Sequence, residues 1–100
     1  MTNSDFADRR STRSEKLTIQ AYRQDDRRTL VLTGELDLGS APTFEDTIAR
    51  VCADGASELV LELSQLEYID ATGLDAVLSA KTLGARSGCD VCLTPRQATR

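Results

Sequence analysis

The order in which strand-like and helix-like apolar periods follow one another along the chain constrains its fold most strongly. Residues 17–22 alternate apolar and polar side chains, as a strand does, and residues 29–33, 59–63 and 89–94 are further short apolar runs. Helical periods separate the later runs, which predicts the order strand, strand, helix, strand, helix, strand. Because 100 residues can build only one hydrophobic core, the sequence predicts a single α/β domain with a sheet of about four strands.

Two segments are predicted to be amphipathic helices. The first is expected to begin at Ser40, with a proline in its first turn, and to end near Gly55. The second is expected to begin at Asp70 and to end at Gly84 or Gly88. Their apolar stripes consist of Phe44, Ile48, Val51 and Cys52 in the first helix and of Leu74, Val77, Leu78 and Ala85 in the second.

The connections predict a mixed sheet with a functional edge. Each helix joins two strands that must run parallel, whereas the first two strands are expected to form a hairpin around a charged, solvated turn at residues 24–28. Glu62 lies on the strand face opposite Leu61, so we expect helices on one side of the sheet only. The loops at 34–40 and 64–72 leave from the carboxyl ends of parallel strands, which usually carry the site. Asp37 and residues 70–73 are therefore expected to share one rim.

The stretch from Asp70 to Gly73 contains the strongest candidate for a functional site. Asp70 can accept hydrogen bonds from the N–H groups of the first helical turn, and Thr72 places its hydroxyl near the positive end of the helix dipole. Gly73 lets another backbone approach closely. A phosphate on Thr72 would add about −1.5 to −2 charges beside Asp70 and Asp37, which makes an electrostatic switch. The alternative is an ordinary helix cap followed by small residues.

Residues 17–94 resemble a STAS domain, and most closely the bacterial anti-sigma factor antagonists. The resemblance lies in the runs at 32–37, 41–42, 59–63 and 68–74, in the family's order and spacing. The last run has the signature of an aspartate, a small residue, Ser or Thr, a glycine and an aliphatic residue. The resemblance implies a STAS-like fold with helices on one side of a mixed sheet.

The same resemblance implies an interaction protein rather than an enzyme, without a cofactor. Members of the family bind an anti-sigma factor, typically a Ser/Thr kinase with a histidine-kinase-like ATPase fold, and thereby release a sigma factor. The kinase phosphorylates the residue before the signature glycine, which is Thr72 here, and a phosphatase reverses the modification. The implied partner surface consists of Asp37, Leu38, Ser40, Asp70, Ala71, Gly73 and Leu74.

The chain departs from the family pattern in two respects. Ala71 stands where the family often has serine, so Thr72 is the only acceptor in the motif. The full final helix of the family is also missing, which is expected to expose apolar surface, lower stability or favour self-association. The alternative function is a STAS interaction subunit, in a lipid-transport complex or a stressosome-type scaffold, whose Thr72 needs no modification. No set of residues predicts a catalytic domain.

Composition argues against several other functions. The chain has no histidine, four aromatic residues and a net charge of −4, which disfavours nucleic-acid binding and histidine-dependent catalysis. It has no apolar run long enough to span a membrane and no secretory signal, so a cytoplasmic chain with reduced thiols is expected. Cys89 and Cys92 are expected to be strand residues without redox or metal chemistry. Residues 1–15 are expected to be a disordered polar tail before a domain at 16–100.

Overall fold

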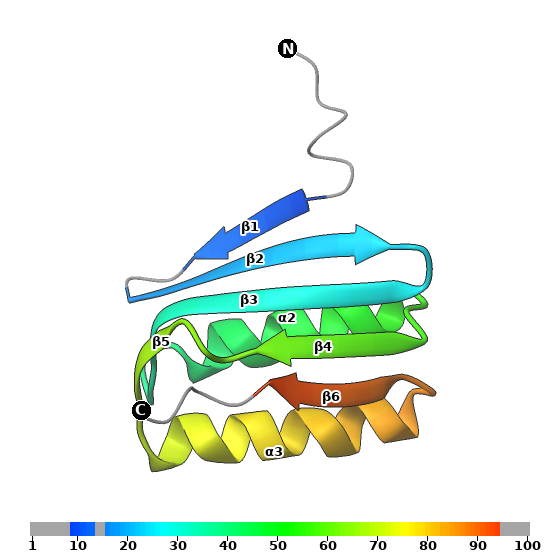
Figure 1. Ribbon diagram of the computed structural model, residues 1–100. Helices are drawn as coiled ribbons and strands as arrows, with labels where there is room; N and C mark the ends of the chain where they lie inside the picture. Colours follow the sequence, from blue (N-terminus) through cyan, green and yellow to red (C-terminus); the bar gives the residue numbers. More distant parts are fainter. Residues whose placement is uncertain (1–8, 14–15, 95–100) are drawn as a thin grey trace.

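The computed structural model describes residues 9–13 and 16–94, which form one sheet covered by two helices (Figure 1). The strands are β1 (Arg9–Arg13), β2 (Leu17–Gln24), β3 (Arg27–Leu36), β4 (Glu58–Glu62), β5 (Leu66–Ile69) and β6 (Asp90–Thr94), and the helices are α2 (Ala41–Ala53) and α3 (Ala71–Arg86). The predicted α/β fold is confirmed, although the sheet has six strands instead of about four.

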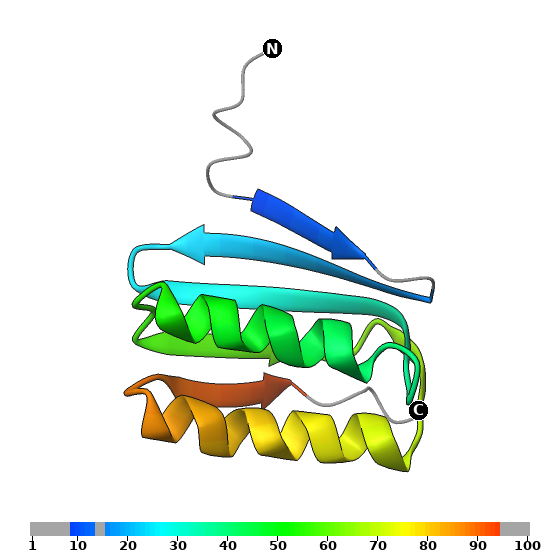
Figure 2. The same cartoon turned by 180° about the vertical axis from the view of Figure 1, so that it is seen from behind.

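The sheet is mixed, and both helices lie on one of its faces. Its strand order is β1-β2-β3-β4-β6, and β5 pairs with the far end of β3. Strands β1, β2 and β3 are antiparallel neighbours, whereas β4 and β5 run parallel to β3, and β6 runs parallel to β4. The opposite views in Figures 1 and 2 show α2 and α3 on the same side of the sheet, which confirms the predicted one-sided cover.

The core lies between this covered face and the two helices. Alternate residues of β2, β3 and β4 enter it, because successive side chains of a strand point to opposite faces. The predicted stripe of α2 is confirmed, since three of its members are buried and Val51 packs against the core. The largest core side chains, each at most 1% exposed, are Leu17, Ile19, Leu30, Leu32, Leu36, Phe44, Ile48, Leu59, Leu61 and Val77.

Strand β1 lies within the segment that was predicted to be a disordered tail. That prediction is wrong for Arg9–Arg13, which pair with β2 from Arg9–Tyr22 to Arg13–Thr18. The segment contains no apolar residue, so the strand forms by backbone hydrogen bonding that an apolar pattern cannot reveal. The rest of the predicted tail lies outside the described residues. Residues 95–100 also lie outside them, so the shortened final helix stays a prediction.

Strand β5 is the second strand that the sequence pattern did not predict. It pairs with the last residues of β3, on both sides of a register shift between Gly34 and Glu35. Gly34 has a φ of +104°, and a Cβ there would collide with the carbonyl oxygen of Lys16. The pairing is too short for a period to be visible, yet it places the start of α3 directly beside the end of β3.

The predicted apolar stripe of α3 is wrong except for Val77. The buried face instead consists of Gly73, Ala76, Val77, Ala80 and Gly84, while Leu74 and Leu78 are about half exposed. A Cβ on Gly84 would collide with the side chain of Val91 and lie 2.8 Å from the carbonyl oxygen of Cys89. Small residues are needed because α3 packs closely on β6 and α2. Gly84 thus lies inside the helix, which ends at Arg86, and Gly88, with a φ of +80°, follows the C-cap as the second predicted end requires.

The charged turn predicted at 24–28 is shorter in the structure. Gln24 pairs with Arg27, so Asp25 and Asp26 form the connection, and Asp25 has a φ of +56°. Arg28 lies in β3 and is only 8% exposed, so the prediction of a solvated turn is wrong for it. Its guanidinium donates to the Asp25 carbonyl oxygen at 3.4 Å and lies 3.7 Å from the carboxylate of Asp54, the C-cap of α2.

Candidate functional site

The loops that follow β3 and β5 meet at one edge of the sheet, as the sequence order predicts. The Asp70 N–H donates to the carbonyl oxygen of Leu36 at 3.3 Å. The Leu38 N–H in turn donates to Oδ2 of Asp70 at 3.3 Å, across 32 residues of sequence. We call the surface formed by residues 36–40 and 69–74 the rim. It lies at the left of Figure 1, where β3 and β5 end and α3 begins.

Asp70 holds the two halves of the rim together. Its Oδ1 accepts the N–H of Gly73 at 2.8 Å, so its predicted role as N-cap of α3 is confirmed. Its Oδ2 accepts the Leu38 N–H from the other loop. One carboxylate therefore fixes both the start of α3 and the loop before α2. We call these two hydrogen bonds the Asp70 clasp.

Asp37 organises the loop before α2. Its Oδ1 accepts the N–H groups of Gly39 at 3.0 Å and Ser40 at 3.1 Å, and its Oδ2 lies 3.7 Å from Nζ of Lys16. Partial burial by itself would raise the pKa of Asp37. The backbone and hydroxyl of Ser40 outweigh this effect, and Lys16 and Gly39 add to theirs, so the pKa lies below its ordinary value of 3.8. Asp37 is therefore a structural carboxylate that stays ionised at neutral pH.

Ser40 has a different role from the predicted side-chain cap. It occupies the N-cap position of α2, but its hydroxyl makes no capping hydrogen bond to the helix. The hydroxyl instead donates to the carbonyl oxygen of Glu35 at 2.8 Å and accepts the Asp37 N–H at 3.0 Å. Ser40 is 1% exposed. It can therefore shape the rim from below, whereas a partner would contact its neighbours.

Thr72 lies in the first turn of α3 and is partly exposed. Its neighbour Ala71 is exposed, and within residues 16–94 no hydrogen bond engages the Thr72 hydroxyl. The hydroxyl is therefore not sealed in the core, and no hydrogen bond within residues 16–94 engages it. Because Thr72 comes two residues after Asp70, a phosphate there would lie at the positive end of the helix and beside the clasp.

Gly73 is required by the fold, as its position in the motif suggested. It is buried, and a Cβ at this position would collide with the carbonyl oxygen of Leu36 and lie 3.0 Å from the Ile69 side chain. The backbone that approaches Gly73 belongs to β3 of the same chain. Its lack of a side chain thus explains how the two loops come together, without any need for an external partner at this residue.

Exposed apolar side chains lie on the rim and beside it. Leu38 is 72% exposed and Leu74 is 51% exposed, and both belong to the predicted partner surface. Leu78 follows Leu74 by one helical turn and is 52% exposed, while Tyr68 on β5 is 50% exposed. Sequence reasoning missed these two, because it assigned Leu78 to the core stripe and recognised no strand at Tyr68. A glycine-and-alanine face on α3 was the available signal that its leucines point outward.

The other candidate sites are not assembled. Cys52, Cys89 and Cys92 are free thiols; the first two are buried and Cys92 is exposed on β6. Burial, together with the neighbouring Cys52, raises the pKa of the Cys89 thiol to about 11. In the described part of the chain, no three His, Cys, Asp or Glu residues are grouped so as to hold a metal ion. Neither of the two described helices is long and apolar enough to cross a membrane.

Comparison with known proteins identifies similar chains. A family model described as STAS domain matches residues 18–99. The anti-sigma-F factor antagonist RsfB of Mycobacterium tuberculosis is 32% identical over 60 residues, which are 60% of this chain and 49% of that protein. The anti-sigma-B factor antagonist of Staphylococcus aureus is 31% identical over 58 residues, 58% of this chain and 54% of that protein. The chain thus aligns with about half the length of these curated relatives.

A solved structure extends the comparison to the fold. The crystal structure of an anti-sigma factor antagonist from Mycobacterium paratuberculosis superposes with a TM-score of 0.67 and is 27% identical in sequence. The match covers 84% of this chain and 73% of that protein. The similarity therefore extends over most of this chain.

Proposed function

The chain belongs to the STAS domain family, and from this membership we propose that it is an anti-sigma factor antagonist. It would bind an anti-sigma factor of the Ser/Thr kinase type and so release a sigma factor, acting as a binding protein rather than an enzyme. The relatives that carry this name support the proposal. The observation that carries it is the Asp70 clasp, which brings Leu38 and Thr72 onto one exposed surface.

The rim offers the partner an apolar contact with a defined shape. Leu38 and Leu74 in the rim, and Leu78 one helical turn beyond it, expose at least half of their surface, and apolar area that is buried on binding contributes about 25 cal/mol per Å². Ala71 is small and leaves the start of α3 accessible. Because hydrogen bonds within the chain already fix both loops, little ordering entropy is lost when a partner binds.

Phosphorylation of Thr72 would reverse this binding. A phosphate adds bulk and about −1.5 to −2 charges next to Asp70, at the centre of the proposed interface. The partly exposed Thr72 hydroxyl at the helix start is accessible to a kinase, and the helix dipole and first-turn N–H groups favour the phosphorylated product. A phosphatase would restore binding. Binding at the rim would thus depend on the relative activities of the kinase and the phosphatase.

The experiment uses kinase-type anti-sigma factors encoded by the genome that carries this chain. Each is incubated with the chain and ATP, and phosphopeptides are mapped by mass spectrometry. We expect one modified residue, Thr72, and none in Thr72→Ala. Thr72→Glu is expected to weaken binding to the same kinase by about tenfold or more, as a charge in the centre of an interface does. Thr82→Glu, an equal charge change at an exposed position later in α3, is the control.

Three outcomes would contradict the proposal. Equal affinities of Thr72→Glu and Thr72→Ala would exclude the switch. Phosphorylation at another residue would exclude Thr72 as its acceptor. Recovery of a transporter ATPase or a scaffold protein, with no anti-sigma factor bound, would assign the chain to a different class of STAS protein.

A further inference from the structure

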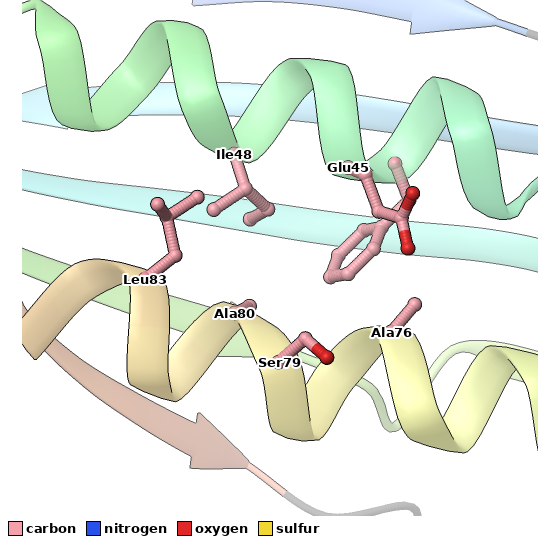
Figure 3. Close-up of a pocket in the computed structure, with 7 residues that line it drawn as sticks. Glu45, Ile48, Ala76, Ser79, Ala80 and Leu83 are labelled. Carbon is pink, nitrogen blue, oxygen red and sulfur yellow. The ribbon is translucent and has the colours of Figure 1, made fainter.

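A shallow apolar groove runs between α2 and α3 on the outer side of the helical layer. Figure 3 shows Glu45 and Ile48 on α2 facing Ala76, Ser79, Ala80 and Leu83 on α3. Phe44 and Ile48 form the floor together with the two alanines, and all four are at most 4% exposed. Glu45 and Ser79 form the walls, and Leu83, which is 37% exposed, closes one end. The groove exists because α3 turns small side chains toward α2.

The groove continues the rim. Thr72 precedes Ala76 by four residues, so the two lie on the same side of α3, one turn apart. Leu74 and Leu78 point away from this side, toward the β6 side of the helix, where Lys81 reaches the Val91 carbonyl oxygen at 3.3 Å. A partner that covers Thr72 therefore meets the groove immediately beyond it.

The size of the groove favours a side chain over a small molecule as its occupant. Its volume is about 210 Å³. Small-molecule pockets typically span roughly 300–1,000 Å³ and enclose most of the ligand. A shallow apolar furrow between two helices instead suits an aliphatic anchor that protrudes from a partner segment, as in helix-in-groove recognition.

The charges around the groove select a basic segment. Glu45 lines the wall, and Asp75 is exposed on α3 beside Ala76. Within the described part of the chain, no ion pair neutralises either carboxylate, whereas Asp46 is paired with Arg50 at 3.7 Å. Two unneutralised carboxylates thus lie close to the end of the groove that adjoins Thr72. Positive charge on the partner would complement them, and a phosphate on Thr72 would add to the same field.

We propose that the α2–α3 groove receives an aliphatic side chain from a basic segment of the anti-sigma factor. This inference rests on the proposed function and deepens it by adding a second contact beside the rim. The groove then provides apolar anchoring, and Glu45 and Asp75 orient the segment. The same segment lies next to Thr72, so it would be the first part of the partner to sense modification there.

The test compares binding of the anti-sigma factors described above to matched variants. Ser79→Phe fills the groove from its exposed wall and is expected to weaken binding about tenfold or more, as loss of an anchor does. Thr82→Phe makes the same kind of change on the solvent side of α3 and is expected to stay within about twofold. Circular dichroism verifies that both variants fold.

Two charge-reversal variants test the sign of the charge on the partner's segment, independently of packing in the groove. Glu45→Lys is expected to weaken binding more than Asp26→Lys, an equal change in the β2–β3 turn at the opposite end of the sheet. The difference is expected to shrink as ionic strength rises from about 50 to 500 mM, because salt screens exposed charges.

The outcomes separate this inference from the proposed function. If Thr72→Glu weakens binding but Ser79→Phe and Glu45→Lys do not, the groove proposal is wrong and the antagonist function stands. If Glu45→Lys strengthens binding, the segment is acidic and the proposal is also overturned. If no anti-sigma factor binds the unaltered chain, both proposals fall together.

Discussion

Gly73→Ala is the substitution that most directly tests how the rim is assembled. The added Cβ would collide with the carbonyl oxygen of Leu36 and lie 2.8 Å from its carbonyl carbon. That carbonyl cannot retreat easily, because it accepts the Asp70 N–H and because β5 pairs with this end of β3. We therefore expect the start of α3 to be displaced, which strains the Asp70 clasp.

The magnitude follows from two opposing effects on the free energy of unfolding. Overpacking a close contact typically costs about 1–3 kcal/mol. Replacing glycine by alanine in a helix contributes about 1 kcal/mol in the opposite direction. Because the added Cβ would meet backbone atoms of Leu36 that are held in the sheet, we expect the steric cost to exceed the helical gain, with a net loss of about 1–2 kcal/mol. In a domain of this size, that loss lowers Tm by roughly 5–15 °C.

Urea denaturation followed by circular dichroism measures the effect. Gly39→Ala is the matched control, because its Cβ would meet only the Asp37 carboxylate at an ordinary 3.5 Å. The control is expected to change the free energy of unfolding by less than about 0.5 kcal/mol. If Gly73→Ala is as stable as the unaltered chain, or more stable, the close approach of β3 to α3 is not what requires glycine, and the reasoning is refuted.

Three further predictions concern single groups. Asp70→Ala is expected to lower the free energy of unfolding by about 1 kcal/mol through loss of the N-cap, as measured by urea denaturation, and to speed hydrogen exchange of the Leu38 amide. Asp75→Ala is the control and is expected to change neither quantity. Because the pKa of Asp37 is lower in the folded state, its ionised carboxylate stabilises the fold above pH 3.8, and this stabilisation is lost as pH falls through the folded-state pKa. The difference in free energy of unfolding between the unaltered chain and Asp37→Asn is therefore expected to vanish in acid. Since burial raises the pKa of Cys89 from 9.0 to about 11, the free energy of unfolding is expected to fall as pH rises through that interval. At neutral pH, a maleimide is expected to label only the exposed Cys92 among the three thiols.

The parts of the fold that follow from apolar periodicity are the parts that the sequence predicts well. Strands β2, β3 and β4 and helix α2 bury large apolar side chains at regular spacing, and each was located correctly. Strand β1 has no apolar residue, and β5 is only four residues long, so neither shows an apolar period in the sequence. These two segments become strands because they pair with a neighbouring strand, and a local sequence pattern does not show which strand will be the neighbour.

Helix α3 shows a different limit of the same reasoning. A hydrophobic stripe marks the core only where the neighbouring element leaves room for large side chains. Here the closeness of α2 and β6 selects Ala76, Ala80 and Gly84, and the leucines are left outside. The distance between elements is a property of the assembled fold, so the leucines could not be assigned to the surface in advance.

The candidate site was predictable in position but not in the roles of its residues. Parallel strand order placed Asp37 and Asp70 on one edge, and the structure brings their loops into hydrogen-bond contact. Which side chain faces a partner was not visible, because Ser40 and Gly73 are buried and act within the chain. Leu78 and Tyr68 were missed because their exposure depends on the packing of α3 and the pairing of β5.

The polar groups that hold the two loops of the rim together bear on how a modification there would act. Asp37, Ser40 and Asp70 fix the two loops through hydrogen bonds that involve neither the Thr72 hydroxyl nor the exposed leucines. These hydrogen bonds hold the surface in one arrangement before any modification, and an effector shifts an equilibrium only between states that it binds differently. A phosphate on Thr72 would therefore act on a preformed surface by its own charge and bulk. The partner's loss of affinity would then depend on how closely it approaches the start of α3, rather than on any rearrangement of the domain.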